Sequence, residues 1–329
     1  MSDNQNIVSV SGMYWSGSSA VIDILSEHPS CNVCPEEFSF FSFGQFFEDI
    51  YRPISQETLV TQDQYMSLIR SLKFNESEPR YLYSALRVLF RNVGYFPKNL
   101  FYRRVGMEKL LGTDYSRASA EFHDYLESCN KTISDIDLDT LNSRIVRVLA
   151  AAASGCRSPD LNNSGQKKLD VFDQLIAPPY LQYSLDSLSS LKIVAVDRCW
   201  KDQYVEVRHT LKNMLNIHRN MNTRPCGETE QMQTLSPQDY FVELRKLTDE
   251  TRKQQEAFSE KNVLWIDFEE LVHNTFECVT KIFRFLDLDP QTWKPNSIFL
   301  PDQSRENVGI WRCSKWQNEI SYIEEKLKS

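Results

Sequence analysis

A β-branched, alternating run near the start of the chain stops at a glycine and passes, after a second glycine, into a helical pattern. Residues 7–11 read Ile-Val-Ser-Val-Ser, Gly12 and Gly17 follow, and two serines open an apolar helical pattern over 18–28. This order predicts a buried strand, a tight loop and a helix. Consecutive main-chain N–H groups and the positive end of the helix dipole would favour a phosphate group in that loop.

The loop lacks the lysine that ordinary nucleoside-triphosphate sites carry after their second glycine, because this chain has Ser18 there. The sequence therefore favours a nucleotide phosphate but not Mg²⁺-dependent transfer of a γ-phosphoryl group. A glycine-and-serine turn that holds no ligand is the alternative interpretation of the same residues.

Composition and charge exclude several classes of protein. The 329 residues are 41% hydrophobic and 25% charged, as in ordinary globular chains. We find no run of about 18 apolar residues and no signal-peptide pattern, so we expect no membrane span and a cytoplasmic location. The net charge of −8 argues against broad nucleic-acid binding, and a small anionic ligand would need a locally positive pocket.

The eight cysteines are scattered and do not form a disulfide framework in a chain of this length. Cys31-x-x-Cys34 could be half a zinc site or a redox pair, but no second Cys-x-x-Cys and no matching histidine pair accompanies it. We expect core packing for these thiols, and no metal.

Helical and strand patterns alternate along the chain, which predicts an α/β fold of three layers around a central parallel sheet. We expect one domain over 1–329, with a large, mostly helical insertion at about 55–190 between sheet strands. Strands are predicted at 7–11, 31–34, 191–197 and 263–268. Helices are predicted at 18–28, 57–73, 79–93, 113–129, 134–153, 237–259, 268–286 and the C-terminal end.

Two charged residues follow predicted strands. Arg198 ends a buried run, and ligands bind beyond the carboxyl ends of parallel strands, where an arginine can grip phosphate. An ion pair with Asp197 or Asp202 is the alternative. Glu37 follows the second strand and could accept a proton from an incoming hydroxyl or amine. Glu36 competes for that role, and a solvated carboxylate is the plainer interpretation.

Taken together and in chain order, these motifs resemble the sulfotransferases that depend on 3′-phosphoadenosine-5′-phosphosulfate (PAPS). The residues that carry the resemblance are Trp15-Ser16-Gly17-Ser18-Ser19, His28-Pro29, Glu36-Glu37-Phe38-Ser39-Phe40-Phe41, Arg198-Cys199-Trp200-Lys201-Asp202, Phe268-Glu269-Glu270-Leu271 and Gly309-Ile310-Trp311-Arg312.

The resemblance implies transfer of a sulfuryl group from PAPS to a hydroxyl or amine of a carbohydrate or small metabolite, with PAP as product and no metal. It makes Glu37 the base and gives Ser16 a catalytic part. The nucleotide contacts that it implies are Tyr14, Trp15, Ser16, Gly17, Ser18, Ser19, Arg198, Lys201, Arg305, Gly309 and Trp311. Trp200 or Trp311 would stack on the adenine.

Two departures from the family pattern keep alternatives open. Trp15 stands where the family has a cation, and Glu206 stands where a serine usually contacts the 3′-phosphate. Lys201, Arg305 or Arg312 could supply the missing positive charge. A sulfotransferase-like protein that binds a nucleotide or glycan without turnover is one alternative. A P-loop kinase and a helical scaffold with an incidental glycine loop are further ones.

Overall fold

The computed structural model describes most of the sheet and its helices. The described residues are 7–13, 15–37, 80–81, 104–105, 107–129, 137–156, 169–176, 181, 188, 190–208, 235–256, 261–293 and 298–328. Five parallel strands form the central sheet in the order β2-β5-β1-β6-β7. They are β1 (Ile7–Gly12), β2 (Cys31–Glu37), β5 (Leu169–Asp173), β6 (Lys192–Asp197) and β7 (Val263–Asp267).

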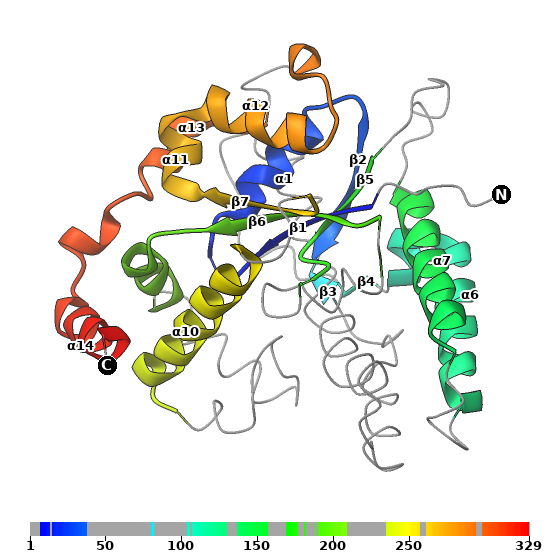
Figure 1. Ribbon diagram of the computed structural model, residues 1–329, viewed down its shortest axis with the longest axis horizontal. Helices are drawn as coiled ribbons and strands as arrows, with labels where there is room; N and C mark the ends of the chain where they lie inside the picture. The colour runs from blue at the N-terminus through cyan, green and yellow to red at the C-terminus, as the bar shows by residue number, and fades with distance from the viewer. Residues whose placement is uncertain are drawn as a thin grey trace.

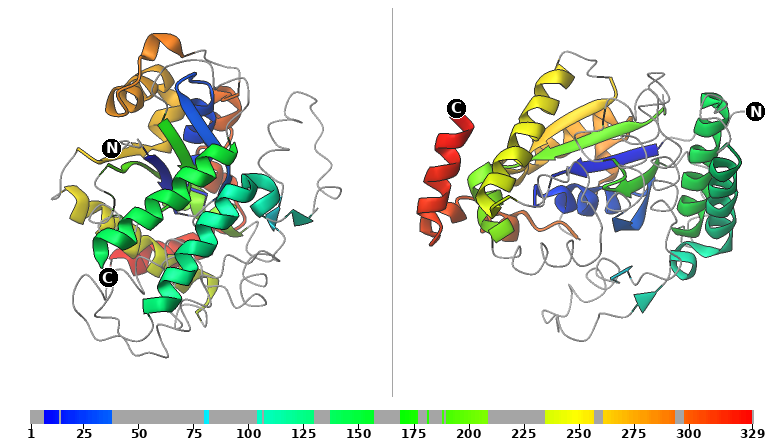
Figure 2. Two further views of the ribbon diagram at one scale, coloured as in Figure 1. Left: turned by 90° about the vertical axis from the view of Figure 1, so that its right-hand side faces the viewer. Right: turned by 90° about the horizontal axis from the view of Figure 1, so that it is seen from below.

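Helices cover both faces of this sheet, which gives the predicted three layers (Figure 1). On one face lie α1 (Ser18–Ser26), α11 (Phe268–His273) and α12 (Thr275–Phe285), and on the other lie α6 (Met107–Ser128), α7 (Leu138–Cys156) and α10 (Pro237–Glu256). Figure 2 shows α6 and α7 side by side at one end of the sheet and the C-terminal helix at the other. The remaining described elements are η8 (Pro290–Thr292), α13 (Pro301–Arg305), η9 (Ile310–Cys313), α14 (Gln317–Lys328) and the separate antiparallel pair β3 (Arg80–Tyr81) and β4 (Arg104–Val105).

The near-continuous apolar run in β6 follows from burial on both faces. Ile193 and Ala195 belong to the core beneath α6 and α7, whereas Val194 and Val196 belong to the core beneath α1 and α12. A strand that alternates between two cores cannot show a polar face. The parallel α/β fold predicted from such runs is therefore confirmed.

The same alternation explains the two cysteines of the second strand. Cys31 and Cys34 are free and buried, and they pack into the cores on opposite faces of the sheet. Burial raises the pKa of the Cys31 thiol to about 12. The interpretations as a redox pair or as half a zinc site were wrong, and these thiols are core residues.

One sheet strand was missed by the sequence analysis. β5 lies inside the range expected to be a helical insertion, yet it pairs with both β2 and β1. Its sequence carries two aspartates, which are depleted in strands. Asp170 is buried there because its Oδ1 accepts a hydrogen bond from Asn32 Nδ2 at 2.8 Å.

The other element boundaries largely follow the patterns. The helices expected at 113–129, 134–153 and 237–259 are α6, α7 and α10, while the one expected at 268–286 divides into α11 and α12 at Asn274. The helix predicted at 57–73 lies outside the described residues. So does most of the helix predicted at 79–93, and residues 80–81 form strand β3 instead.

The topology places the first loop at a switch point of the sheet. β1 is the middle strand, with β5 and β2 on one side and β6 and β7 on the other. Crevices beyond the carboxyl ends of strands at such a point are where open α/β sheets bind ligands. Within the described residues, no helix is long and apolar enough to cross a membrane.

Candidate functional site

The loop between β1 and α1 is a tight turn that needs both of its glycines. Ser16 N–H donates to Met13 O at 2.9 Å, and a Cβ on Gly12 would lie only 1.9 Å from Ser16 Oγ. Gly17 has φ +92°, and a Cβ there would lie 2.2 Å from the ring of Phe268. Both positions thus disfavour a side chain, because the Ser16 side chain and the Phe268 ring approach too closely.

Trp15 occupies this turn with a left-handed backbone. Its φ is +53°, a conformation that is uncommon for a residue with a bulky side chain. Its half-buried indole packs against the same cluster as Trp200 and Trp311. Backbone conformations of this kind persist where the surrounding structure enforces them, and they concentrate at ligand sites.

Arg198 reaches this turn from the carboxyl end of β6. Its Nη1 donates to Trp15 O at 3.2 Å and its Nη2 donates to Asn307 O at 2.5 Å, and the side chain is 6% exposed. The ion pair with Asp197 or Asp202, considered as an alternative, is not what holds it. Burial lowers the pKa of Arg198, while the negative charges of Glu206, Asp202 and Glu269 oppose that shift.

Two buried polar atoms at this turn find no partner within the part of the chain that the structure describes. Ser16 Oγ and Arg198 Nε have no hydrogen-bond partner among the residues that the structure describes. Ser16 is 2% exposed. Buried donors are normally satisfied, so an orphaned pair that lies on two elements meeting at one loop suits an absent ligand oxygen.

Asp202 shapes the C-terminal turn that carries Gly309 and Trp311. Its carboxylate is 1% exposed and accepts Gly309 N–H at 2.7 Å and Trp311 N–H at 3.0 Å. Gly309 has φ +77°, which favours glycine. Asp202 thereby brings two predicted nucleotide contacts to the helix at 200–208 that follows Arg198.

Asp197, the last residue of β6, has its own cations. Arg245 of α10 grips it in a bidentate pair at 2.7 and 2.9 Å, and Arg252 bridges it to Asp267 at 3.2 and 2.9 Å. Asp197 Oδ1 also accepts the N–H of Arg198 at 2.8 Å. This network fixes the main chain from which the Arg198 side chain departs.

Gln174 is a loop residue that the sequence analysis did not select. Its Oε1 accepts Gly12 N–H at 3.2 Å and its Nε2 donates to Ser18 Oγ at 2.8 Å. It comes directly after β5, a strand that was itself missed, so no signal in the sequence could have placed it beside the loop.

Two predicted cations have other partners. Lys201 pairs with Glu324 at 3.0 Å and lies over the rings of Trp200 and Trp311. Arg305 donates to Val272 O at 2.9 Å and pairs with Asp302. That either residue supplies the positive charge that the side chain of Trp15 lacks stays a prediction.

The predicted base, Glu37, lies at the carboxyl end of β2, which is an edge strand of the sheet. Glu37 is the last residue of β2, and its main chain pairs with Asp173 of β5 after a shift in register between Cys34 and Glu37. The side chains of Glu36 and Glu37, and the whole of Tyr14, lie outside the described residues.

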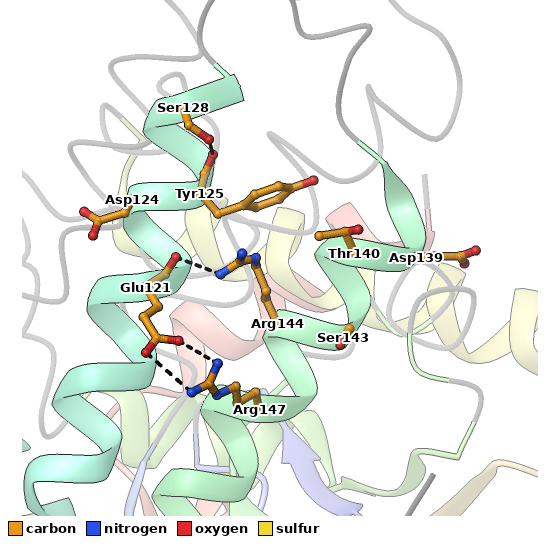
Figure 3. Close-up of a pocket in the computed structure, with 9 residues that line it drawn as sticks. All are labelled: Glu121, Asp124, Tyr125, Ser128, Asp139, Thr140, Ser143, Arg144 and Arg147. Atoms are coloured by element: carbon orange, nitrogen blue, oxygen red, sulfur yellow. Dashed lines mark hydrogen bonds and ion pairs between the residues drawn. The ribbon is translucent and has the colours of Figure 1, made fainter. Parts of the chain in front are cut away.

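A hollow of about 800 Å³ lies elsewhere, between α6 and α7 (Figure 3). Its two arginines are both turned toward Glu121, since Arg147 pairs with its carboxylate at 2.6 Å and Arg144 donates to its main-chain oxygen at 3.1 Å. The Arg144 guanidinium also lies over the Tyr125 ring. The hollow shares no residue with the loop after β1, and both of its arginines already contact Glu121.

No protein-family model matches the chain, and no curated protein matches it significantly. Among solved structures, it aligns with a sulfotransferase from Alicyclobacillus acidocaldarius at 14% identity, over 98% of this chain and 96% of that one, with a TM-score of 0.40. It aligns with the sulfotransferase domain of a Synechococcus olefin synthase at 14% identity, over 99% and 97% of the two chains, with a TM-score of 0.43. A Mycobacterium tuberculosis sulfotransferase aligns at 12% identity, over 93% and 76%, with a TM-score of 0.37. Alignments at these values do not establish an activity, so the function has to be inferred from the loop and its neighbours.

Proposed function

We propose that the chain is a sulfotransferase that moves the sulfuryl group of PAPS to a hydroxyl or amine of an acceptor. The observation that carries the proposal is the 3.2 Å contact between Arg198 Nη1 and Trp15 O, because it joins the two elements that would hold the nucleotide. Each element also holds a buried polar atom without a partner among the described residues, Ser16 Oγ and Arg198 Nε. An anion bound in the loop would offer such buried atoms an acceptor.

The proposed roles follow the geometry of the loop. The N–H groups of Gly17, Ser18 and Ser19 and the hydroxyls of the loop serines bind the 5′-phosphosulfate, where the positive end of the α1 dipole adds to them, while Ser16 N–H stays bonded to Met13 O within the turn. Arg198 holds the 3′-phosphate with its planar guanidinium. Trp311 or Trp200 stacks on the adenine. The remaining proposed nucleotide contacts are Tyr14, Trp15, Lys201, Arg305 and Gly309.

The transfer itself is an in-line displacement at sulfur. The acceptor oxygen or nitrogen forms a bond to sulfur while the bond from sulfur to the bridging oxygen of the 5′-phosphate breaks, and PAP leaves. Glu37 takes the acceptor's proton. The loop amides and Ser16 stabilise the charge that develops on the leaving phosphate, so positioning and electrostatics do most of the work.

Labelled PAPS tests this proposal. The wild-type chain should bind PAP and transfer label to a hydroxyl acceptor from a panel of carbohydrates and small metabolites. Glu37→Gln should keep its PAP affinity and transfer about 10²-fold or more slowly, because it cannot take the proton. Arg198→Ala should lose PAP affinity. Glu250→Gln, on an exposed part of α10, is the matched control.

Either of two results would contradict these roles. A wild-type chain that binds no PAP contradicts the nucleotide assignment. A near-normal transfer rate in Glu37→Gln eliminates that residue as the base. ATP hydrolysis that depends on Mg²⁺ would favour the kinase alternative, against which Ser18 in place of lysine argues.

A second candidate function is nucleotide or glycan binding without turnover. It is favoured by Trp15, which packs into an aromatic cluster at the position where the resembled family has a cation. One donor lost at a developing charge costs about 10²–10³ in rate. PAP binding without transfer to any acceptor on the panel would support this candidate. We also propose a cytoplasmic location with reduced thiols, in keeping with the scattered free cysteines.

A further inference from the structure

We propose that Gln174 is a positioning residue that orients the Ser18 hydroxyl as a hydrogen-bond donor to the anion in the loop. The inference deepens the proposed function. It rests on one part of that proposal, namely that the loop binds an anionic group. It concerns the position at which ordinary nucleotide loops carry lysine and this chain carries serine.

The backbone of Gln174 is held in an uncommon conformation at the carboxyl end of β5. Its φ is +53°, in the left-handed region. Its N–H donates to Val10 O at 2.8 Å, which anchors it to β1, and the side chain is 9% exposed. A left-handed glutamine costs free energy relative to glycine, so the surrounding contacts must hold this residue in place.

The Gln174 side chain spans both ends of the loop. Gly12 N–H, at the end of β1, donates to its Oε1 at 3.2 Å. Its Nε2 donates to the hydroxyl of Ser18, the first residue of α1, at 2.8 Å. The reverse orientation of the amide would set Nε2 against the Gly12 N–H, two donors facing each other, so the assignment of oxygen and nitrogen follows from the contacts.

This contact decides what the serine hydroxyl can do. A side-chain NH₂ group can only donate, so Ser18 Oγ must accept from Gln174. A hydroxyl carries one hydrogen, and that hydrogen then remains for another acceptor. Ser18 stands at the N-terminus of α1 beside the loop amides, where the acceptor in reach is an anion. The pair therefore supplies a directed neutral donor in place of a lysine.

A double-mutant cycle tests the inference with PAP as the probe. Ser18→Ala and Gln174→Met should each weaken PAP binding about tenfold, the usual effect of losing a hydrogen bond to a charged group. The double variant should be no weaker than Gln174→Met alone, because the contribution of the Ser18 hydroxyl depends on Gln174. Gln174→Asn keeps the amide and tolerates the backbone but is one methylene too short, so it should behave like Gln174→Met. Gln254→Met, exposed on α10, should bind as the wild type does.

Each remaining outcome overturns the inference or supports it. A Gln174→Met variant that melts earlier but binds PAP normally has lost only structural support, which overturns the positioning role. Losses that multiply in the double variant overturn it as well. If the wild type binds no PAP, the proposed function fails, and the same cycle is run with pyrophosphate, which needs only the loop. Coupled losses there support the inference, and a wild type that binds neither anion overturns both.

Discussion

Arg198 donates through Nη1 to the main-chain oxygen of Trp15 at 3.2 Å, across a sequence separation of 183 residues. Its Nη2 reaches Asn307 in the same way at 2.5 Å. One guanidinium thus ties the loop after β1 and the C-terminal turn to the end of β6. Both acceptors are neutral carbonyls, so these two contacts do not neutralise the guanidinium, whose charge is felt by the carboxylates of Glu206, Asp202 and Glu269.

Replacing Arg198 by lysine should separate charge from geometry. A single ammonium group keeps the charge but cannot reproduce the planar fork that reaches Trp15 and Asn307. We expect PAP affinity to fall at least tenfold and the free energy of unfolding to fall by about 1–3 kcal/mol. Calorimetric titration and urea unfolding measure the two effects. Arg117→Lys, whose pair with Asp114 is exposed, should change neither. PAP binding at wild-type affinity in Arg198→Lys would show that the planar guanidinium is not needed.

Gly17→Ala and Gly309→Ala form a matched pair. Both glycines have a positive φ, but a Cβ on Gly17 would lie 2.2 Å from the Phe268 ring, whereas the nearest atom to a Cβ on Gly309 is 3.6 Å away. Gly309→Ala should therefore cost about 1 kcal/mol for its backbone alone. Gly17→Ala adds overpacking and should cost about 1–3 kcal/mol more. Urea unfolding of both variants gives the difference, and equal losses would show that the ring yields easily.

Asp202→Asn should loosen the C-terminal turn. The amide can accept from only one of Gly309 N–H and Trp311 N–H, and its NH₂ would face the other donor. We expect a loss of about 1–3 kcal/mol in the free energy of unfolding and faster hydrogen exchange at both amides. Asp302→Asn, at a carboxylate whose side chain is 92% exposed, is the control. Unchanged exchange at 309 and 311 would mean that another group holds the turn.

The stability of the fold should depend on pH through Asp197. Burial alone would raise the pKa of this carboxyl, but the hydrogen bonds and charge of Arg245, the Arg198 N–H and the charge of Arg252 outweigh it and hold the pKa below its ordinary 3.8. A depressed folded pKa stabilises the native state above the unfolded pKa, and this contribution is lost as pH falls through the folded value.

Asp197→Asn should accordingly cost about 1–3 kcal/mol at pH 7. The reason is that half-buried Arg245 and Arg252 lose this buried carboxylate and keep only Asp249 and Asp267. The gap between wild type and variant should narrow below about pH 4, as the wild-type carboxyl itself becomes protonated. Urea unfolding at a series of pH values measures this difference in the free energy of unfolding. Asp124→Asn, at an exposed position of α6, is the control. A gap that stays constant down to pH 2 would rule out this carboxyl as the source.

The sequence by itself determined the elements whose signal is local. Consecutive residues define the loop at 12–17, the apolar run of β6 and the long helices. Their spacing alone therefore predicts a parallel α/β fold and a loop of the phosphate-binding type. The position of Arg198 at the carboxyl end of a sheet strand could be predicted in the same way, because it directly follows a buried apolar run.

Only the tertiary structure decided which groups meet. It placed β5 beside β1 and Gln174 across the loop. It paired Asp197 and Asp202 with groups other than the Arg198 side chain, and Lys201 with Glu324. The physical reason is that the hydrogen bonds between Gly12 and Gln174, and between Trp15 and Arg198, form only when strands far apart in the sequence are aligned in the sheet. The residues next to each partner in the chain give no information about the other partner.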